Sequence, residues 1–372
     1  MGTPQLMGRA GCAEPTSSDM KAKLWRHMRT IGPAFAPLWS FACYPPSTSG
    51  PVVSVIEEVT TLITTASAAL AGPAAMVVTD NGDVLLLDAM LARILVISPD
   101  GTIKRTIGSE GAGPGEFRRP RGLAVHADTI RVVDQGNGRM QLFSVAGEHL
   151  GSAPIPGGAG GGPLSLRADG WLAVGTRGRD STLAAYFDET ATRRGVLGIP
   201  LVPPSALWDF VAIKNQIAQG EVPSVLRNVA RPIFAHEGGF WLMFAADPLI
   251  HRYRSDNELA WAVTVEVPEV DTIMGTFFER NHREPNPNAF YPLSYFTDAV
   301  DVGGHLWLLL NVPDDIPSVV LVIDAAGSVA HRLVFSSVRG ASVLAVDPER
   351  RRVYLAMRSD ATLIAAAFPE GM

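Results

Sequence analysis

Two aspartates in this chain stand at equivalent places of a repeating pattern. Asp88 lies five residues before Arg93, and Asp134 lies five residues before Arg139, with a step of 46 residues from one aspartate to the next. An aspartate and an arginine that face each other across a tight turn form a charge-assisted hydrogen bond that fixes the turn. Because a catalytic group is needed once whereas this pair recurs, we predict that both pairs are structural.

Sequence motifs that carry catalysis are missing from this chain. It has no His-Glu-x-x-His pair for zinc and no Gly-x-Ser-x-Gly nucleophile turn. The glycine-rich stretch 157–162 lacks the Lys-Ser or Lys-Thr that would complete a phosphate-binding loop, and the eight histidines are scattered. We therefore predict no catalytic residue, no metal site and no cofactor, and we interpret 157–162 as a link between repeats.

The elements around these aspartates form a repeated unit of short strands. In the first unit, turns at Asn81-Gly82 and Asp100-Gly101 help to separate four mainly apolar or β-branched runs, at 75–79, 84–87, 93–98 and 102–107. The second unit repeats this order, and turn signals of the same kind continue at 169–170, 238–239, 303–304 and near 348. This spacing indicates six units.

One four-stranded sheet cannot bury both of its faces, whereas sheets arranged radially cover one another. We therefore predict an all-β fold, a six-bladed β-propeller with four antiparallel strands per blade. An all-β sandwich also has frequent turns, but the 46-residue recurrence of Asp, Arg and Gly favours the propeller.

The last unit contains only three strands, at 342–346, 353–357 and 362–368. A β-branched segment at 52–64 precedes the first unit. We predict that this segment pairs with the last three strands and closes the ring. The chain then divides into a leader or disordered segment, 1–50, and a propeller, 51–372.

The second unit resembles an NHL repeat, a family of propeller blades. The resemblance rests on GPGEF at 113–117, RPRGLAV at 119–125, and Asp134, Asn137, Arg139, Gln141, Phe143 and Gly147. It covers about 80 residues, and the first unit has Leu91 where the pattern has asparagine. The resemblance implies a platform that binds a protein, a ligand or sometimes RNA; few relatives are enzymes.

Two insertions, 203–223 and 268–292, lengthen the connections between units. Each has apolar residues at helical spacing, and the second continues into a polar segment broken by proline at 279–288. Because both join the end of one blade to the start of the next, we predict two short helices on one rim of the channel, with a site there for a protein or small ligand. The candidate residues are Trp208, Asp209, Lys214, Asn215, Phe278, Arg280, His282 and Arg283, with Asn281 and Asn286 beside them. A plainer interpretation, that these are solvated helix faces, stays open.

Six-bladed enzymes such as lactonases are similar in architecture to this predicted fold. That similarity implies a divalent cation such as Ca²⁺, held in the channel by carboxylate and amide oxygens. The carboxylates that could serve are Asp80, Asp88, Asp134, Asp301 and Asp324. We predict non-catalytic binding; the alternative is a metal-dependent hydrolase or lyase of this kind.

The composition favours a large apolar core and a mildly acidic surface. Hydrophobic residues make up 47% of the chain and charged residues 18%, with a net charge of −6. Nucleic-acid surfaces depend on clustered Lys and Arg, and the run Arg118, Arg119 and Arg121 is short. We therefore predict no nucleic-acid partner, and we expect a monomer.

The amino-terminal region is similar to an export leader. A basic stretch at 21–29 precedes an apolar stretch at 31–42 that ends in Ser40-Phe41-Ala42, a small-x-small sequence. We predict export to the periplasm or the extracellular space, with no transmembrane span. A lipid anchor at Cys43 fits less well, because Ser40 stands where an aliphatic residue is expected.

Overall fold

The structure, a computed structural model, describes residues 50–64, 70–156, 163–203 and 209–372. The leader-like segment up to residue 49, the glycine-rich stretch 157–162 and Trp208 lie outside the described residues. Within the described ranges the chain consists mainly of short strands, with three α-helices.

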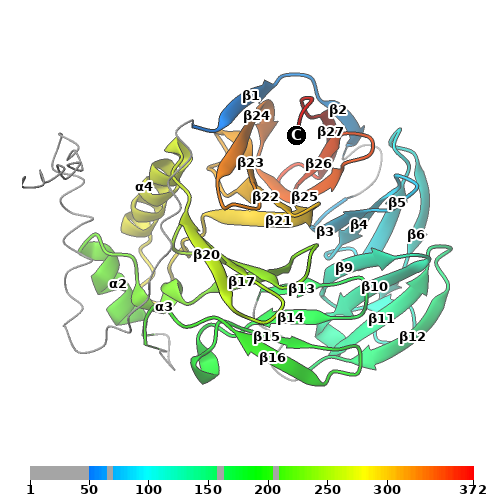
Figure 1. The fold of residues 1–372 in the computed structure, drawn as a ribbon, viewed down its shortest axis with the longest axis horizontal. Helices are drawn as coiled ribbons and strands as arrows, with labels where there is room; N and C mark the ends of the chain where they lie inside the picture. The colour runs from blue at the N-terminus through cyan, green and yellow to red at the C-terminus, as the bar shows by residue number, and fades with distance from the viewer. Residues whose placement is uncertain (1–49, 65–69, 157–162, 204–208) are drawn as a thin grey trace, which may run out of the picture. The chain divides into compact units, whose positions relative to one another are not determined.

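Consecutive strands form six small sheets, called blades 1 to 6 here (Figure 1). Blade 1 contains β3 (Pro73–Val78), β4 (Val84–Asp88), β5 (Arg93–Ile97) and β6 (Ile103–Ile107). Blade 2 contains β9 (Pro120–His126), β10 (Thr129–Asp134), β11 (Arg139–Ser144) and β12 (His149–Pro154). Blade 3 contains β13 (Leu164–Leu166), β14 (Leu172–Gly175), β15 (Ala184–Phe187) and β16 (Arg193–Leu197).

The second half of the chain continues in the same order. Blade 4 contains β17 (Ala230–Phe234), β18 (Phe240–Phe244), β19 (Leu249–Tyr253) and β20 (Leu259–Thr264). Blade 5 is built on β21 (Phe296–Val302), β22 (His305–Leu310), β23 (Pro317–Ile323) and β24 (Val329–Arg339), and blade 6 on β25 (Ala341–Asp347), β26 (Arg352–Met357) and β27 (Thr362–Ala367). Smaller elements are the paired strands β7 (Ser109–Glu110) and β8 (Glu116–Phe117) and the 3-10 helices η1 (Gln135–Asn137) and η2 (Arg179–Ser181).

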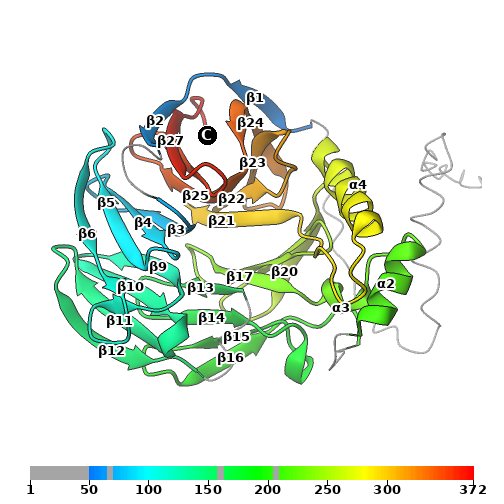
Figure 2. The same cartoon turned by 180° about the vertical axis from the view of Figure 1, so that it is seen from behind.

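The six blades form a ring around a common centre (Figures 1 and 2). Their innermost strands β3, β9, β13, β17, β21 and β25 contact one another in this order, and β25 contacts β3. The predicted six-bladed propeller of antiparallel four-stranded sheets is therefore confirmed. The turn residues that recur along the chain separate the strands of these blades.

Apolar side chains between neighbouring blades form the core. All residues of β4 are buried, as expected for a strand that is covered on both faces. One apolar cluster joins Val84 and Leu86 of blade 1 to Val343 and Tyr354 of blade 6. Each sheet therefore has its faces covered by its neighbours, which is why the blades are stable as a ring rather than singly.

The recurring aspartates are buried inside their own blades. Asp134 accepts a hydrogen bond from Arg139 Nε at 2.9 Å, so the predicted pair is present in blade 2. In blade 1, Asp88 accepts from the backbone N–H groups of Ala71 and Gly72, and it lies opposite Arg93 in the strand register. Asp88 also accepts from the Leu91 N–H of the following turn at 3.1 Å. Both carboxylates therefore stabilise turns, and the predicted Asp–Arg ion pair is confirmed for blade 2.

The ring is closed by a strand from the amino-terminal side of the chain. Strand β2 (Thr60–Ile63) pairs antiparallel with β27 and completes blade 6, with Thr61 opposite Ile364. Ile63 is almost fully buried among residues of blades 6 and 1. The predicted closure is confirmed for these residues.

The first part of the predicted closing strand lies elsewhere. Strand β1 (Val52–Ile56) pairs parallel with β24 and forms a fifth strand of blade 5, with Val53 opposite Arg332. The prediction that the whole segment 52–64 joins the last blade is therefore wrong for β1. The segment contains Glu57 and Glu58, two exposed acidic residues that interrupt the β-branched run and divide it between two blades.

The helices occupy the two predicted insertions. Helices α2 (Phe210–Ala218) and α3 (Ser224–Arg227) connect blade 3 to blade 4, and α4 (Pro268–Arg283) connects blade 4 to blade 5. Helix α4 is longer than expected, because the polar residues after Glu279 continue it to Arg283. It ends just before Pro285, since the residue that precedes a proline is disfavoured in helical conformation.

Both insertions lie on the same side of the ring, beside blades 4 and 5 (Figures 1 and 2). Lys214 Nζ of α2 donates to the Glu284 carbonyl just after α4 at 3.1 Å, and the rings of Phe210 and Phe290 are 6.1 Å apart. None of the helices in the described part of the chain has the length and hydropathy that a membrane crossing requires.

Candidate functional site

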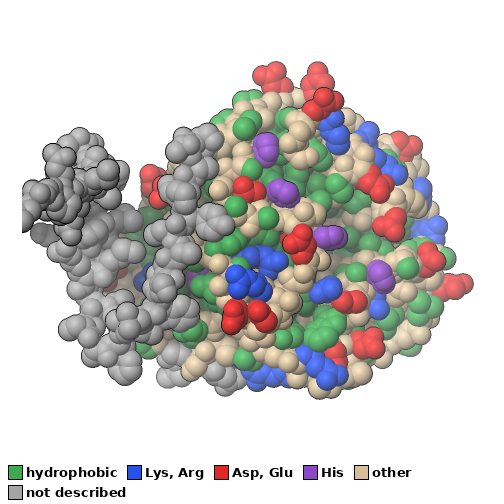
Figure 3. All heavy atoms as spheres, in the orientation of Figure 1, with side chains coloured by type: hydrophobic (Ala, Val, Ile, Leu, Met, Phe, Trp, Pro, Cys, Tyr) green, Lys and Arg blue, Asp and Glu red, His purple; other side chains and the backbone are tan. Residues whose placement is uncertain are grey.

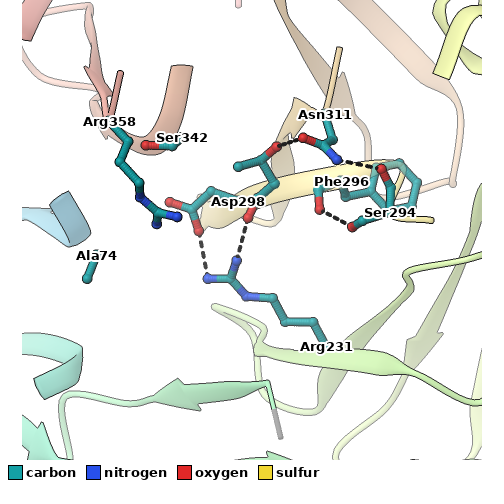
Figure 4. Close-up of a pocket in the computed structure, with 9 residues that line it drawn as sticks. Ala74, Arg231, Ser294, Phe296, Asp298, Asn311, Ser342 and Arg358 are labelled. Atoms are coloured by element: carbon teal, nitrogen blue, oxygen red, sulfur yellow. Dashed lines mark hydrogen bonds and ion pairs between the residues drawn. The ribbon is translucent and has the colours of Figure 1, made fainter. Parts of the chain in front are cut away.

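A cavity of about 290 Å³ lies where several inner strands begin, and we call it the channel cavity. The inner strands β3, β17, β21 and β25 each contribute their second residue to its wall, namely Ala74, Arg231, Thr297 and Ser342. The other lining residues are Ser294, Phe296, Asp298, Asn311 and Arg358 (Figure 4). Equivalent register positions of four blades thus meet at one place, because the blades repeat around one axis.

A charged network crosses this cavity. Arg231 Nη2 donates to Asp298 Oδ1 at 2.6 Å, and Nη1 donates to the Thr297 carbonyl at 3.0 Å (Figure 4). The buried Asp298 also accepts from the backbone N–H groups of Ala299 and Leu344, each at 2.9 Å. Since Arg231, Asp298 and Leu344 belong to blades 4, 5 and 6, this network joins three blades.

Arg358 reaches the same cavity from the turn after β26 (Figure 4). Its Nη2 donates to the carbonyl of Pro73 at 3.4 Å, a long hydrogen bond. Among the described residues, no carboxylate forms an ion pair with this guanidinium. Arg358 therefore presents charge and hydrogen-bond donors to the cavity.

Small polar side chains complete the wall. Ser294 Oγ donates to the Phe296 carbonyl at 2.9 Å, and Ser342 Oγ donates to the Ala356 carbonyl at 3.2 Å. Asn311 Nδ2 donates to the Ser294 carbonyl at 2.9 Å. Because both serine hydroxyls donate to carbonyls rather than to a histidine or carboxylate, neither is arranged as an activated nucleophile.

A second cavity, the helix groove, adjoins the first. It measures about 110 Å³ and lies between α4 and the segments 291–294 and 311–314. Ser294 and Asn311 line both cavities. Asn281 of α4 fixes one wall, because its Nδ2 donates to the Tyr291 carbonyl at 3.0 Å and its Oδ1 accepts from the Tyr291 N–H at 2.9 Å. The two cavities therefore form one composite surface.

The residues predicted on the first insertion lie outside both cavities. Asp209 caps α2, where its carboxylate accepts from the backbone of Val211 and Ala212. Lys214 connects the two helical insertions through its bond to Glu284, and Asn215 is exposed. The structure thus gives Asp209 and Lys214 structural contacts, and Trp208 lies outside the described residues.

The residues predicted on the second insertion lie along α4. Arg280 lines the helix groove and is the one predicted candidate, among those that the structure describes, that lines either cavity. Phe278 is half-buried, and its ring lies 6.4 Å from that of the exposed His282. Arg283 pairs with Glu279 on the solvated face at 2.6 Å. None of these residues lines the channel cavity, and Arg280 lines the helix groove.

Sequence reasoning missed Arg231, Asp298 and Arg358. Arg231 carried a usable signal, since it is a cation at the second position of an otherwise apolar inner strand. Arg121 stands at the equivalent position of β9. Arg358 follows a buried strand in a turn, where a charged residue is ordinary, so only the ring closure places it at the cavity.

The five aspartates of the metal-dependent alternative do not come together. Two are engaged inside blades 1 and 2, as described above. Asp301 accepts from Trp241 Nε1 at 2.7 Å, Asp324 accepts from the backbone of its own turn, and Asp80 is exposed. Among the residues that the structure describes, no group of three His, Cys, Asp or Glu side chains is placed to hold a metal ion.

Acidic and basic side chains are interspersed over the described part of the face in Figure 3. Lys and Arg side chains gather near the middle of this face, with Asp and Glu side chains directly beside them. This mixture differs from the continuous basic surface on which phosphate-backbone binding depends.

Comparisons with known proteins agree with the architecture. A family described as "6-bladed beta-propeller" has a model that matches residues 52–155. No curated protein has a matching sequence. Blades 1 and 2, where the NHL-like pattern lies, therefore also carry the similarity to a known propeller family.

Several solved structures are similar over most of this chain. A protein from Bacteroides fragilis, provisionally described as exported, is 12% identical with a TM-score of 0.51, over 85% of this chain and 98% of its own. Virginiamycin B lyase from Staphylococcus aureus is 13% identical with a TM-score of 0.49, over 84% and 99%. A gluconolactonase from Xanthomonas campestris is 14% identical with a TM-score of 0.48, over 88% and 99%. At such identities the likeness concerns the fold alone.

Proposed function

We propose that this protein is a non-catalytic binding platform for a small ligand or a protein segment. The site is the composite surface of the channel cavity and the helix groove, on the side of the ring that carries α4. One observation carries this proposal: Ser294 and Asn311 line both cavities. The polar channel cavity and the partly apolar helix groove therefore share a wall and form one surface.

Two features support binding rather than turnover. The cavity is lined by groups that orient a ligand, namely two guanidiniums, an amide and hydroxyls. The hydroxyls of Ser294 and Ser342 donate to backbone carbonyls, and Asp298 accepts from Arg231 and two backbone N–H groups. Such a wall lacks the nucleophile and base in contact that acyl transfer or hydrolysis requires.

A position inside the ring also suits a binding function. Blades 4, 5 and 6 are fixed to one another by the network of Arg231, Asp298 and Leu344, so the wall is preorganised and little ordering is lost when a ligand binds. Export to the periplasm or beyond remains a prediction from the amino-terminal residues, which lie outside the described ranges.

A ligand screen on the full chain tests the platform. Small polar and aromatic compounds are added to the wild type, to Asn311→Ala and to Thr190→Ala, and binding is read by ligand-observed NMR. Asn311 lines both cavities, whereas Thr190 lies in an exposed turn of blade 3. We expect ligands whose affinity falls about tenfold in Asn311→Ala, because an oriented hydrogen-bonding group is lost, and is unchanged in Thr190→Ala.

Two results would count against the platform. One is binding that Asn311→Ala leaves intact for every ligand, which would move the site elsewhere. The other is conversion of a bound lactone or ester into product at a rate that depends on added Ca²⁺, which would establish the metal-dependent alternative.

A further inference from the structure

The acceptor side of the charged network in the channel cavity is already occupied. Asp298 Oδ1 accepts from Arg231 Nη2 at 2.6 Å and from the Ala299 N–H at 2.9 Å. Asp298 Oδ2 accepts from the Leu344 N–H at 2.9 Å. The single carboxylate of this cavity therefore neutralises Arg231 and has little capacity left for a second cation.

The second guanidinium has no such partner. Arg358 points into the cavity in Figure 4, and its one hydrogen bond is the 3.4 Å contact with the Pro73 carbonyl. A guanidinium has five N–H donors, so most of the donors of Arg358 remain for a ligand. With Arg231 balanced by Asp298, the cavity lining carries one net positive charge.

We propose that the channel cavity binds the carboxylate of a small monoanionic ligand through Arg358. The planar guanidinium matches a carboxylate in two parallel hydrogen bonds. The hydroxyls of Ser294 and Ser342 lie in the same wall and accept hydrogen bonds from polar groups of the ligand body. This inference rests on the proposed binding function and specifies the chemical class of its ligand.

Charge and size favour a small monoanion over a dianion. One net positive charge is balanced by one carboxylate, whereas a phosphate dianion would place excess negative charge beside the buried Asp298. A cavity of about 290 Å³ is near the lower end of ligand pockets, so it accommodates one small molecule. A body longer than the cavity extends past Asn311 into the helix groove, beside Phe277 and Leu293.

Arg231 and Asp298 act as positioning residues in this arrangement. Their ion pair connects blade 4 to blade 5, and the Leu344 N–H extends the connection to blade 6, which carries Arg358. The pair therefore holds the two sides of the cavity at a fixed separation. Arg358 alone is assigned the contact with the ligand.

The test compares acids with their uncharged amides. The probes are lactate with lactamide and hippurate with hippuramide, titrated into the full chain at millimolar concentrations and followed by NMR. We expect each acid to bind the wild type about tenfold or more tightly than its amide, because a charged hydrogen bond is lost in the amide. Inorganic phosphate at the same ionic strength is expected to compete weakly.

Three variants test whether Arg358 causes the preference for acids over amides. Arg358→Gln should bind acid and amide equally, and Arg358→Lys should retain part of the preference, since it keeps the charge but loses the planar fork. Arg254→Gln is the control, because Arg254 is an exposed arginine of a turn in blade 4, paired with Glu258. Unchanged thermal unfolding of all three shows that the exposed substitutions leave the fold intact.

The outcomes separate this inference from the proposed function. Binding of acids and amides with equal affinity at the Asn311-dependent site leaves the platform intact and overturns the charge assignment. A preference for acids that survives in Arg358→Gln also overturns it. Tighter binding of phosphate than of either acid assigns the cavity to a different anion, and the absence of any acid preference refutes the inference.

Discussion

At the residue scale, buried polar groups decide which parts of the ring are fixed. Asp298 is buried and satisfied by Arg231 and by two backbone N–H groups, so its charge is stabilised where it lies. Arg358 is exposed and has only one long hydrogen bond. Arg231 is therefore held within the framework of the cavity, whereas Arg358 is free to make the ligand contact proposed above.

A half-buried histidine, His251, makes the stability of blade 4 depend on pH. The rings of His251 and Phe244 have their centroids 4.8 Å apart. Burial lowers the pKa of His251 from 6.5 to about 4. The folded protein therefore keeps this imidazole neutral, whereas the unfolded chain accepts a proton below pH 6.5. The contribution of His251 to stability is complete above pH 6.5 and is lost as the pH falls toward 4.

We expect His251→Leu to reduce the loss of stability in acid. Between pH 7 and pH 5 the free energy of unfolding of the wild type should fall by about 2 kcal/mol more than that of His251→Leu. Urea unfolding at both pH values measures this difference. His126→Leu replaces an exposed histidine and should follow the wild type; equal pH dependence in the wild type and His251→Leu would show that burial does not control this titration.

The sequence could predict the residues that act within one blade. The five-residue spacing of Asp134 and Arg139 predicts their pair, because both residues lie next to the same turn. Arg231, Asp298 and Arg358 come from three blades, and their meeting depends on the ring. No residue spacing along the chain predicts that these three residues meet. Of the candidate residues predicted from the sequence, Arg280 is the one that lines a cavity in the described part of the chain.

At the element scale, α4 is fixed to blade 5 by an ion pair at its first turn. Glu269 pairs with Arg332 of β24, and both side chains are largely buried. An acidic residue near a helix N-terminus also interacts favourably with the helix dipole. This contact sets the position of α4, which forms a wall of the helix groove.

Removing this anchor should cost stability, and an exposed pair on the same helix supplies the control. We expect Glu269→Ala to lower the free energy of unfolding by about 1–3 kcal/mol, because Arg332 loses its partner in a largely buried place. Glu279→Ala, which removes the solvated pair with Arg283, should change it by about 0.5 kcal/mol or less. Chemical denaturation measures both, and equal effects would show that the Glu269 pair is not an anchor.

Most elements follow from local patterns, and the exceptions have physical reasons. Turn residues such as Asn81-Gly82 divide the strands of blade 1 near the predicted positions. Strand β1 was assigned to the wrong blade, because a β-branched run predicts a strand but not its partner. Helix α4 extends through residues that were expected to be irregular, since polarity alone does not end a helix.

At the scale of the whole molecule, the ring depends on one strand that comes from far away in the sequence. Strand β2 covers the edge of β27 and places Ile63 between blades 6 and 1. Strand β1 instead adds to the edge of blade 5, and Val52, Val53 and Val55 stay more than half exposed. The two neighbouring strands therefore differ in what their loss would uncover.

Two shortened chains test this difference. A chain that begins at Glu57 keeps β2, and we expect it to remain a folded propeller with a small decrease in Tm. A chain that begins at Leu70 lacks β2, leaves the edge of β27 unpaired and exposes the core around Ile364, so we expect a much lower Tm and aggregation. Calorimetry and size-exclusion chromatography measure both; equal behaviour of the two would show that β2 does not close the ring.

The pairing of β2 with β27 also determines when blade 6 can close during translation. Ile63 leaves the ribosome about 300 residues before its partner Leu363, a delay of roughly 15–60 s at ordinary elongation rates. During that interval β2 has no strand partner, because β27 is the strand with which it pairs. Blades 1 to 5 can form while the chain is still growing, whereas the seam of blade 6 forms only after β27 has been synthesised.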